Sequence, residues 1–316
     1  KLPAKGSVTN TATNKELGTT TLTLSNGAKV TYKITDYKND EVIFRAYSPG
    51  GTSLYSDEEL LKIGFANGGL TSAGIGGYSL TDLQKFMSGK IARVRPSIGS
   101  NEEGMSGTAA PKDLETMFQM IHLYFTDLNK DEAAYQSFIS KQKGFIGNLM
   151  ADPGFYFSNE TDKHRNEGNS RYLGFPTNEK YDNSDYHLAY TKYQERFANA
   201  GDFHFYFVGN LEEGKLKDLA EQYIATLPAQ KGTENYVVHE FREADKFEKF
   251  VVERGTDPKS RVSISWQEEA KAEKKEIMAI KALGEVLTIK LIEQLREEES
   301  GVYGVGARGN YNKVPY

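Results

Sequence analysis

Hydrophobic and polar positions alternate in the first part of the chain, which is the pattern of half-buried strands. Residues 19–35 form two alternating runs around Asn26-Gly27, the dipeptide most typical of a two-residue β-hairpin. A third alternating run covers residues 41–49. The pattern therefore predicts three strands, followed by a helix that Ser56 caps.

Farther along, a second strand pair is predicted at 90–99 and 103–109, and helical periodicity then takes over. The predicted helices begin at Pro111 and continue with 131–150, 186–198 and 212–225. Between the last two, residues 201–211 alternate phenylalanine with polar residues and predict a buried strand. Residues 154–185 are polar and glycine-rich, and the pattern assigns them to loops.

A second set of elements follows a polar, irregular stretch. Strands are predicted at 246–253, 261–267 and 302–309, with a long helix at 271–295. The domain prediction is a polar tail or linker at 1–18, an α+β domain at 19–230, a linker at 231–245, and a second, truncated domain at 246–316. The fold class is α+β, with two related domains, each an antiparallel sheet covered by helices and the second incomplete.

Composition narrows the function. The net charge is −5 with charges of both signs mixed, which argues against a nucleic-acid-binding protein. No apolar run is long enough to span a membrane. The chain has no cysteine, so disulfides and thiolate metal sites are excluded, and the compartment stays open. The loop 71–79 lacks the spacing of a phosphate-binding loop and is interpreted as a flexible turn.

The histidines do not predict a metal site. They are His122, His164, His187, His204 and His239, and no two of them have the spacing that places two imidazoles on one face of a helix. His122 lies beside an apolar stripe and His204 within an aromatic strand, so both are interpreted as packed or edge side chains. We therefore expect this chain to bind no metal.

Arg296 and Tyr303 are the candidate functional residues. Arg296 ends the long predicted helix, and Tyr303 opens the strand that follows Gly301. Guanidinium and phenol groups are hydrogen-bond donors suited to a carbonyl oxygen that gains negative charge. Structural roles are the alternative, because arginine is favourable at a helix C-terminus and tyrosine is common in strands.

The run LREEESGVYGVG, residues 295–306, resembles the arginine–tyrosine motif in the non-catalytic half of the pitrilysin (insulinase-like, M16) zinc peptidases. The opening hairpin and the strand–turn–helix at 201–228 are similar to the same family, and these segments cover most of residues 19–311. The resemblance departs at the metal motif: the catalytic half carries His-x-x-Glu-His on its first long helix. The corresponding helix here, SLYSDEELLKIGFANGG (residues 53–69), contains no histidine.

The resemblance implies a role beside a metal held elsewhere. It implies zinc on a partner catalytic half, in the same polypeptide or a separate subunit, with Arg296 and Tyr303 acting in trans as donors to the substrate or oxyanion. This chain would line the chamber that encloses unfolded peptides and would be inactive alone. A bacterial periplasm or cell envelope is the setting that the resemblance suggests. Two alternatives stay open: a non-catalytic structural or peptide-binding subunit of the same fold, and an unrelated α+β ligand-binding domain.

Overall fold

The computed structural model describes residues 2–241 and 247–312. The chain divides into two compact units, which are treated separately below. The first unit contains residues 1–237 with 250–252, and the second contains 238–249 with 253–316.

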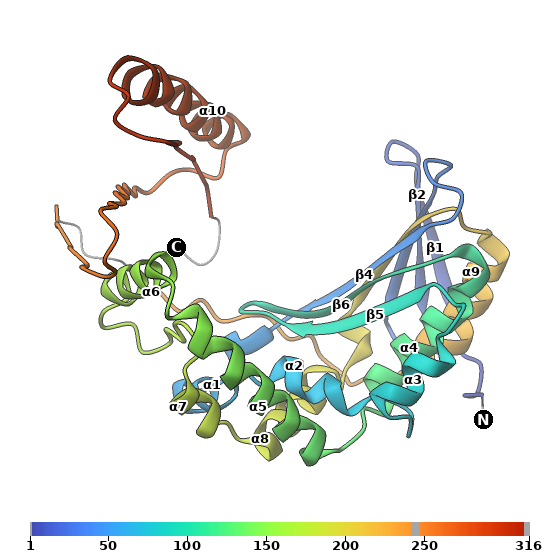
Figure 1. The fold of residues 1–316 in the computed structure, drawn as a ribbon. Helices are drawn as coiled ribbons and strands as arrows, with labels where there is room; N and C mark the ends of the chain where they lie inside the picture. The colour runs from blue at the N-terminus through green and yellow to red at the C-terminus, as the bar shows by residue number, and fades with distance from the viewer. Residues whose placement is uncertain (1, 242–246, 313–316) are drawn as a thin grey trace. The chain divides into compact units, whose positions relative to one another are not determined.

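A seven-stranded sheet forms the centre of the first unit, in the order β1-β2-β3-β7-β4-β6-β5 (Figure 1). The strands are β1 (Val8–Asn14), β2 (Thr19–Leu24), β3 (Lys29–Ile34), β4 (Val42–Pro49), β5 (Ala92–Ile98), β6 (Glu102–Ala109) and β7 (His204–Gly209). All neighbouring strands are antiparallel except β3 and β7, which are parallel. The α+β class is confirmed, and the β3–β7 pair is the one departure from the expected antiparallel pairing. Strand β7, which comes last in the chain, lies between β3 and β4. Because β3 and β4 run in opposite directions, β7 can be antiparallel to only one of them.

Helices cover one face of this sheet (Figure 1). They are α1 (Asp57–Ile63), α2 (Asn67–Leu70), α3 (Leu80–Phe86), α4 (Leu114–Thr126), α5 (Glu132–Leu149), α6 (Pro153–Arg165), α7 (Asn178–Asp182), α8 (Tyr186–Arg196) and α9 (Glu213–Leu219). We call the opposite side of the sheet the open face. Within the described residues, no helix is both long and apolar enough to cross a membrane.

Aromatic rings between the sheet and α4 form the centre of the core. Phe207 on β7 is fully buried and stacks on Phe118 of α4, with ring centroids 4.8 Å apart, and on Phe44 of β4 at 5.0 Å. Phe205, two positions earlier on β7, is also fully buried. The period-two alternation that predicted this strand thus sends its phenylalanines to the helices and its intervening residues to the open face.

Two segments predicted as irregular are regular in the structure. Val8–Asn14, part of the predicted polar tail, is edge strand β1 and pairs with β2. Its side chains are mostly exposed threonine and asparagine, so no hydrophobic alternation marked it. In the predicted loop region 154–185, α6 and α7 are helical. Asp152 caps α6 through the Gly154 and Phe155 amides, and Pro153 occupies the first turn, a start signal that the polar composition obscured.

The glycine-rich loop is an ordered turn. The Asn129 side chain donates to the carbonyls of Ala73 and Tyr78 and accepts from the Gly77 amide. Gly74 has φ 85°, and a β-carbon there would lie 2.1 Å from the Tyr78 carbonyl oxygen. The segment is a turn, and one side chain satisfies three of its backbone groups.

The second unit is built around the helix α10 (Lys274–Leu291), which continues as the π-helical segment η6 (Ile292–Glu298). The chain then returns along α10. Thr288 donates from its hydroxyl to the Ala307 carbonyl and accepts from the Ala307 amide, both at 2.9 Å. The helix backbone at Gly284 lies so close to Gly309 that a β-carbon on Gly284 would be 2.5 Å from the Gly309 nitrogen.

The strands predicted in this second unit are not observed. The described residues of 246–253, 261–267 and 302–309 contain no strand, and residue 246 lies outside the described residues. Alternation predicts a strand only where another strand supplies ladder hydrogen bonds. The described residues of the second unit contain no strand to supply them.

Removal of the central ring of the first unit tests this account of the core. Phe207→Ala is expected to destabilise the unit by about 3–5 kcal/mol, because it leaves a cavity between β7 and α4. Urea unfolding followed by tyrosine fluorescence measures the change. Val208→Ala, on the next residue and 38% exposed on the open face, is the matched control, with an expected loss under about 1 kcal/mol. Equal losses in the two variants would contradict the assignment of the core.

Candidate functional site

A tight turn at the end of β4 is built around a buried carboxylate. Gly51 has φ 61°, and a β-carbon there would lie 2.4 Å from the Gly99 carbonyl oxygen, so only glycine fits. Its amide donates to Oε2 of Glu103 at 2.7 Å, and Glu103 is 2% exposed. Because β6 places Glu103 opposite Ser48, its side chain lies on the helix-covered face of the sheet.

Burial controls the protonation of this carboxylate. Loss of water around Glu103 raises its pKa to about 7, against the lowering effects of the Gly51 amide and of Arg196. Arg196, at the end of α8, is 8% exposed, and its Nε atom is buried without a hydrogen-bond partner in the described part of the chain. A β-carbon at Gly50 would lie 2.9 Å from Nη1 of Arg196 and 3.0 Å from Oε2 of Glu103, so both groups crowd against this turn.

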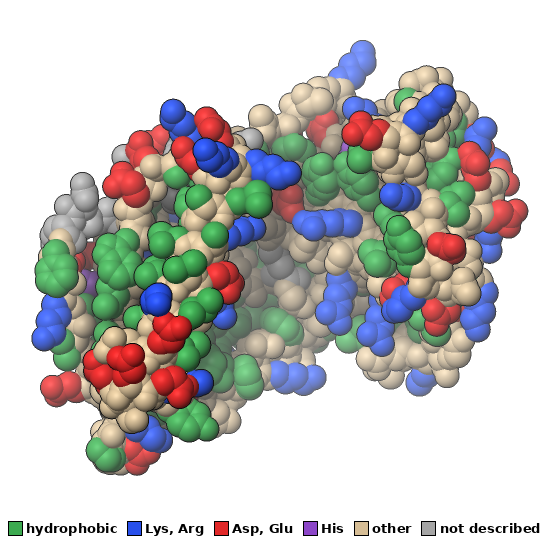
Figure 2. Space-filling view, turned by 90° about the horizontal axis from the view of Figure 1, so that it is seen from above, with side chains coloured by type: hydrophobic (Ala, Val, Ile, Leu, Met, Phe, Trp, Pro, Cys, Tyr) green, Lys and Arg blue, Asp and Glu red, His purple; other side chains and the backbone are tan. Residues whose placement is uncertain are grey.

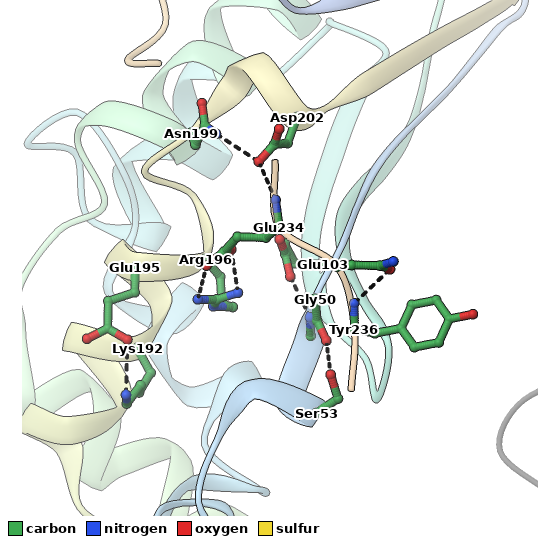
Figure 3. A network of polar contacts seen from close by, with 12 residues as sticks. Gly50, Ser53, Glu103, Lys192, Glu195, Arg196, Asn199, Asp202, Glu234 and Tyr236 are labelled. Carbon is green, nitrogen blue, oxygen red and sulfur yellow. Dashed lines mark hydrogen bonds and ion pairs between the residues drawn. The ribbon is translucent and has the colours of Figure 1, made fainter. Parts of the chain in front are cut away.

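The same arginine holds the beginning of the segment predicted as a linker (Figure 3). Arg196 Nη1 donates to Glu234 Oε2 at 2.9 Å, and the Glu234 amide donates to Asp202 at 3.2 Å. The Val237 amide donates to the Ser53 hydroxyl at 3.0 Å, and that hydroxyl donates to the Gly50 carbonyl at 2.6 Å. Residues 234–237 therefore belong to the first unit and are fixed over the turn at Gly50.

Helix α1 is the segment that corresponds to the metal-binding helix in the resemblance. Ser56 and Glu59 form a reciprocal capping box at its start. Lys192 of α8 joins α8 to α1 through an ion pair with Glu59 at 2.9 Å, and it also pairs with Glu195 of its own helix at 3.0 Å. The ammonium group also lies 5.6 Å from the centre of the Tyr55 ring. The exposed carboxylate of α1 nearest to α8 is thus engaged by a lysine.

The polar groups around Gly50 and α1 stabilise the fold and do not form a catalytic site. Glu103 has a pKa suited to a general base, but a side chain that is 2% exposed cannot reach a substrate. The Tyr55 hydroxyl is buried, and burial raises its pKa, so it stays neutral. The groups instead fix the turn at Gly50, helix α1 and the segment 234–237 to one another.

The histidines lie apart and serve different local contacts. His122 bonds to the Tyr223 carbonyl at 2.9 Å, His187 lies 3.7 Å from Glu132, and His164 stacks on Phe250 with ring centroids 4.2 Å apart. No group of three or more metal-ligating side chains occurs among the residues that the structure describes. The residues of α1 do not fit zinc, because they offer no imidazole.

The open face of the sheet is the accessible surface of the first unit. A chain of hydrogen bonds crosses its centre: Thr21 to Thr31 at 2.7 Å, Thr31 to His204 Nε2 at 2.7 Å, and His204 Nδ1 to the Tyr206 hydroxyl at 2.9 Å. Tyr206 then stacks on Tyr47, with hydroxyl groups 3.3 Å apart. His204, interpreted from the sequence as a packed or edge residue, is a half-buried member of this chain.

The two residues singled out from the sequence lie in the second unit. Arg296 is in η6, about half exposed, and pairs with the adjacent Glu297 at 2.7 Å. The Tyr303 side chain is fully exposed, after the turn in which Gly301 donates to the Leu295 carbonyl. Within the described chain no contact joins Arg296 to Tyr303, so their joint role remains a prediction.

Comparison with known proteins gives the class of this chain. Residues 187–314 match the family described as "Peptidase M16 inactive domain". The chain is 22% identical over 299 residues to the probable zinc protease PqqL of Haemophilus influenzae, covering 90% of this chain and 30% of that protein. Residues 187–314 are therefore similar to the inactive domain of the M16 zinc peptidases, and the chain contains no His-x-x-Glu-His motif.

Solved structures agree on the fold. The periplasmic protease PqqL from Escherichia coli superposes with a TM-score of 0.76 at 20% identity, covering 98% of this chain and 34% of that one. The ferredoxin protease FusC, solved with Arabidopsis ferredoxin, has a TM-score of 0.60 at 16% identity and covers 77% of this chain and 26% of its own. The chain is similar to PqqL in sequence and fold, and it spans about a third of the length of these PqqL relatives.

Sequence reasoning did not find Glu103, Arg196 and Glu234, because their roles depend on contacts between distant segments. One signal was present: Glu103 occupies an inward position of a strand, where a charged side chain requires a partner. The aromatic strand pointed to Tyr206 and His204 only as packing residues.

Because Glu103 is buried, we expect the free energy of unfolding to fall as the pH rises. The pKa of Glu103 is about 7 when folded, against 4.5 as the ordinary value, so the folded state binds more protons between these two pH values. Stability is then highest at and below about pH 4.5 for this group and is lost through pH 7, by about 3 kcal/mol at most. Glu103→Gln should remove this dependence and make the protein more stable than wild type at about pH 8.

Urea midpoints at about pH 5 and pH 8 measure this effect. Glu102→Gln is the matched control, because Glu102 is adjacent on β6 but about half exposed on the open face. The control should keep the pH dependence of wild type. A wild-type slope that survives in Glu103→Gln would show that another group causes it.

Proposed function

We propose that this chain is the zinc-free half of a PqqL-like zinc metallopeptidase. It completes the peptide chamber of a catalytic half and supplies hydrogen-bond donors to a zinc site held there. The metal, when bound to that half, supplies an activated water for peptide hydrolysis. This chain's own residues bind and orient the peptide.

The observation that carries the proposal is that α1 contains no histidine. The family's catalytic helix needs two imidazoles and a carboxylate on one face. Here that helix has no histidine, and its Glu59 is paired with Lys192. The match of residues 187–314 to the inactive domain is consistent with this loss. A chain similar to this family, with no metal-ligating cluster among its described residues, would take part in proteolysis beside a partner half.

The open face is the surface that we assign to the chamber wall. None of the described helices of the first unit covers it, and it presents hydroxyl, aromatic and basic side chains in cross-strand rows. The hydroxyl groups of Thr31 on β3 and Tyr206 on β7 are already held in place by His204, and Thr31 is also bonded to Thr21 on β2. Such a surface can hydrogen-bond an extended peptide without rearranging, which lowers the entropic cost of binding.

Tyr303 and Arg296 are the donors that we assign to the reaction. Full exposure leaves the Tyr303 hydroxyl available to a group outside this chain. Arg296 would exchange its exposed pair with Glu297, a weak interaction, for a substrate carbonyl or the partner half. Arg296 lies in the last helical turns, and Tyr303 lies in the segment that returns along the helix and is bonded to Thr288 at Ala307.

The partner and compartment follow the relatives. The partner is a catalytic M16-like half, in the same polypeptide or a separate subunit, with zinc bound on that half, and the substrates are unfolded peptides. PqqL from Escherichia coli is a periplasmic protease, and FusC was solved with a protein substrate, ferredoxin. We extend the periplasmic setting and polypeptide substrates to this chain as part of the proposal.

Reconstitution tests the proposal directly. The chain and the half that carries His-x-x-Glu-His are assayed with a quenched fluorescent peptide, separately and mixed, with and without a zinc chelator. Activity should appear or rise only on mixing and should disappear with the chelator. If the mixture forms a stable complex without any gain of activity, the chain is a structural or peptide-binding subunit of the same fold instead.

Within the reconstituted enzyme, Tyr303→Phe should lower kcat by about a hundred- to a thousandfold, the usual cost of one oxyanion donor. KM should change little, because the lost interaction forms mainly in the transition state. Tyr311→Phe, the same change in the same unit, is the control. Equal kcat values for Tyr303→Phe and the control, with assembly intact, would reject the role of Tyr303.

A further inference from the structure

The open face of the sheet is basic although the chain as a whole is acidic. By strand register and alternation, the charged residues on this face are Lys29, Lys33, Arg45, Arg93, Arg95 and Glu102. Five are cations and one is an anion, in a chain of net charge −5. Figure 2 shows the molecule from above Figure 1, with lysine and arginine side chains in blue, acidic ones in red and hydrophobic ones in green.

The cations are arranged in rows that cross the strands. In one row the register runs from Lys33 on β3 through Val208 and Ile43 to Arg93 on β5. In the next row Arg45 and Arg95 stand on either side of Ser106. From β3 to β5 the sheet spans about 19 Å at the usual strand spacing. The positive charge is therefore spread over the width of the face and is not confined to one spot.

Most of this charge is uncompensated. Lys29, Lys33, Arg93 and Arg95 form no ion pair in the part of the chain that the structure describes. Arg45 pairs with Glu102 at 3.2 Å, but the two side chains are 67% and 51% exposed. An exposed pair of this kind is easily exchanged for another carboxylate.

The groups between the cations are neutral and already oriented. Burial, together with the charge of Lys29, lowers the pKa of His204, and burial raises the pKa of Tyr206, so both are uncharged near pH 7. Ile43 is 52% exposed and Val208 is 38% exposed on the same face. The open face thus offers a bound peptide small apolar side chains and hydroxyl groups, surrounded by positively charged side chains.

We propose that the open face selects acidic segments of extended polypeptides, whose carboxylates pair with the lysines and arginines of β3, β4 and β5. This names a substrate class for the proposed function and rests on it. Favourable potential across the face would draw acidic segments to the chamber and disfavour basic ones.

A polypeptide fits this face better than a nucleic acid. A nucleic-acid interface needs a strongly basic domain, whereas this chain has a pI near 5.7. The exposed apolar side chains Ile43 and Val208 suit the side chains of a peptide. Tyr47 and Tyr206 stack on one another and so leave fewer free ring faces for bases.

Binding to the intact chain alone tests the inference. Fluorescence anisotropy is measured with labelled peptides of about 10 residues, one of alternating glutamate and serine, one with glutamine in place of glutamate, and one with lysine. The glutamate peptide should bind more tightly than the glutamine peptide, and the lysine peptide should not bind. Raising salt from about 0.15 M to about 1 M should remove the difference, because screening shortens from about 8 Å to about 3 Å.

Matched variants locate the site. Lys29→Gln, Arg93→Gln and Arg95→Gln combined should weaken the glutamate peptide about tenfold. Lys112→Gln, Lys141→Gln and Lys217→Gln combined remove the same net charge from exposed positions outside the sheet and should leave binding near wild type. Circular dichroism confirms that both variants are folded.

Three results would overturn the inference: equal binding of the glutamate and glutamine peptides, equal weakening by the two triple variants, and a single-stranded oligo-dT that binds as tightly as the glutamate peptide. The proposed function stands or fails separately. Activity on mixing with the catalytic half, without a preference for acidic peptides, would reject only the substrate class. Acidic-peptide binding without activity on mixing would reject the peptidase role.

Discussion

The first unit depends on the insertion of one late strand into a sheet formed by early ones. β7 enters between β3 and β4, and its alternation does two things at once. Phe205 and Phe207 point to the helices and close the core, while His204 and Tyr206 point to the open face. Because neighbouring residues of a strand must face opposite ways, a change of register by one residue would destroy the core and the hydrogen-bonded surface together.

The basic surface and the acidic overall charge follow from the same separation. The helices and loops carry the excess of carboxylates in water, whereas the positions of β3, β4 and β5 that face away from the helices carry cations. No composition measure shows this, because net charge averages over both sides. The net charge of the whole chain therefore says nothing about the face on which a polypeptide would bind.

The parts predicted from sequence are those whose signals are local. The hairpin at Asn26-Gly27, the capped helix at Ser56 and the phenylalanine strand were all readable, because turn chemistry and periodicity are contained in a few residues. Three features could not be predicted from the sequence: the parallel pairing of β3 with β7, the edge strand β1, and the cluster of Glu103, Arg196 and Glu234. They join positions far apart in the chain, and polar residues at such contacts leave no hydrophobic pattern. The choice of Arg296 and Tyr303 rests on family resemblance, and their joint role stays a prediction.

The return of the chain onto α10 has a consequence for the tyrosine at 303. The segment that bears it is tethered at both ends, by the helical backbone before Gly301 and by the two hydrogen bonds between Thr288 and Ala307. Because the segment is short and held at both ends, the Tyr303 ring can move only over a small volume, although it is exposed to water. An approaching surface would therefore meet the ring at a nearly constant distance from the helix, and little conformational entropy would remain to be lost on contact.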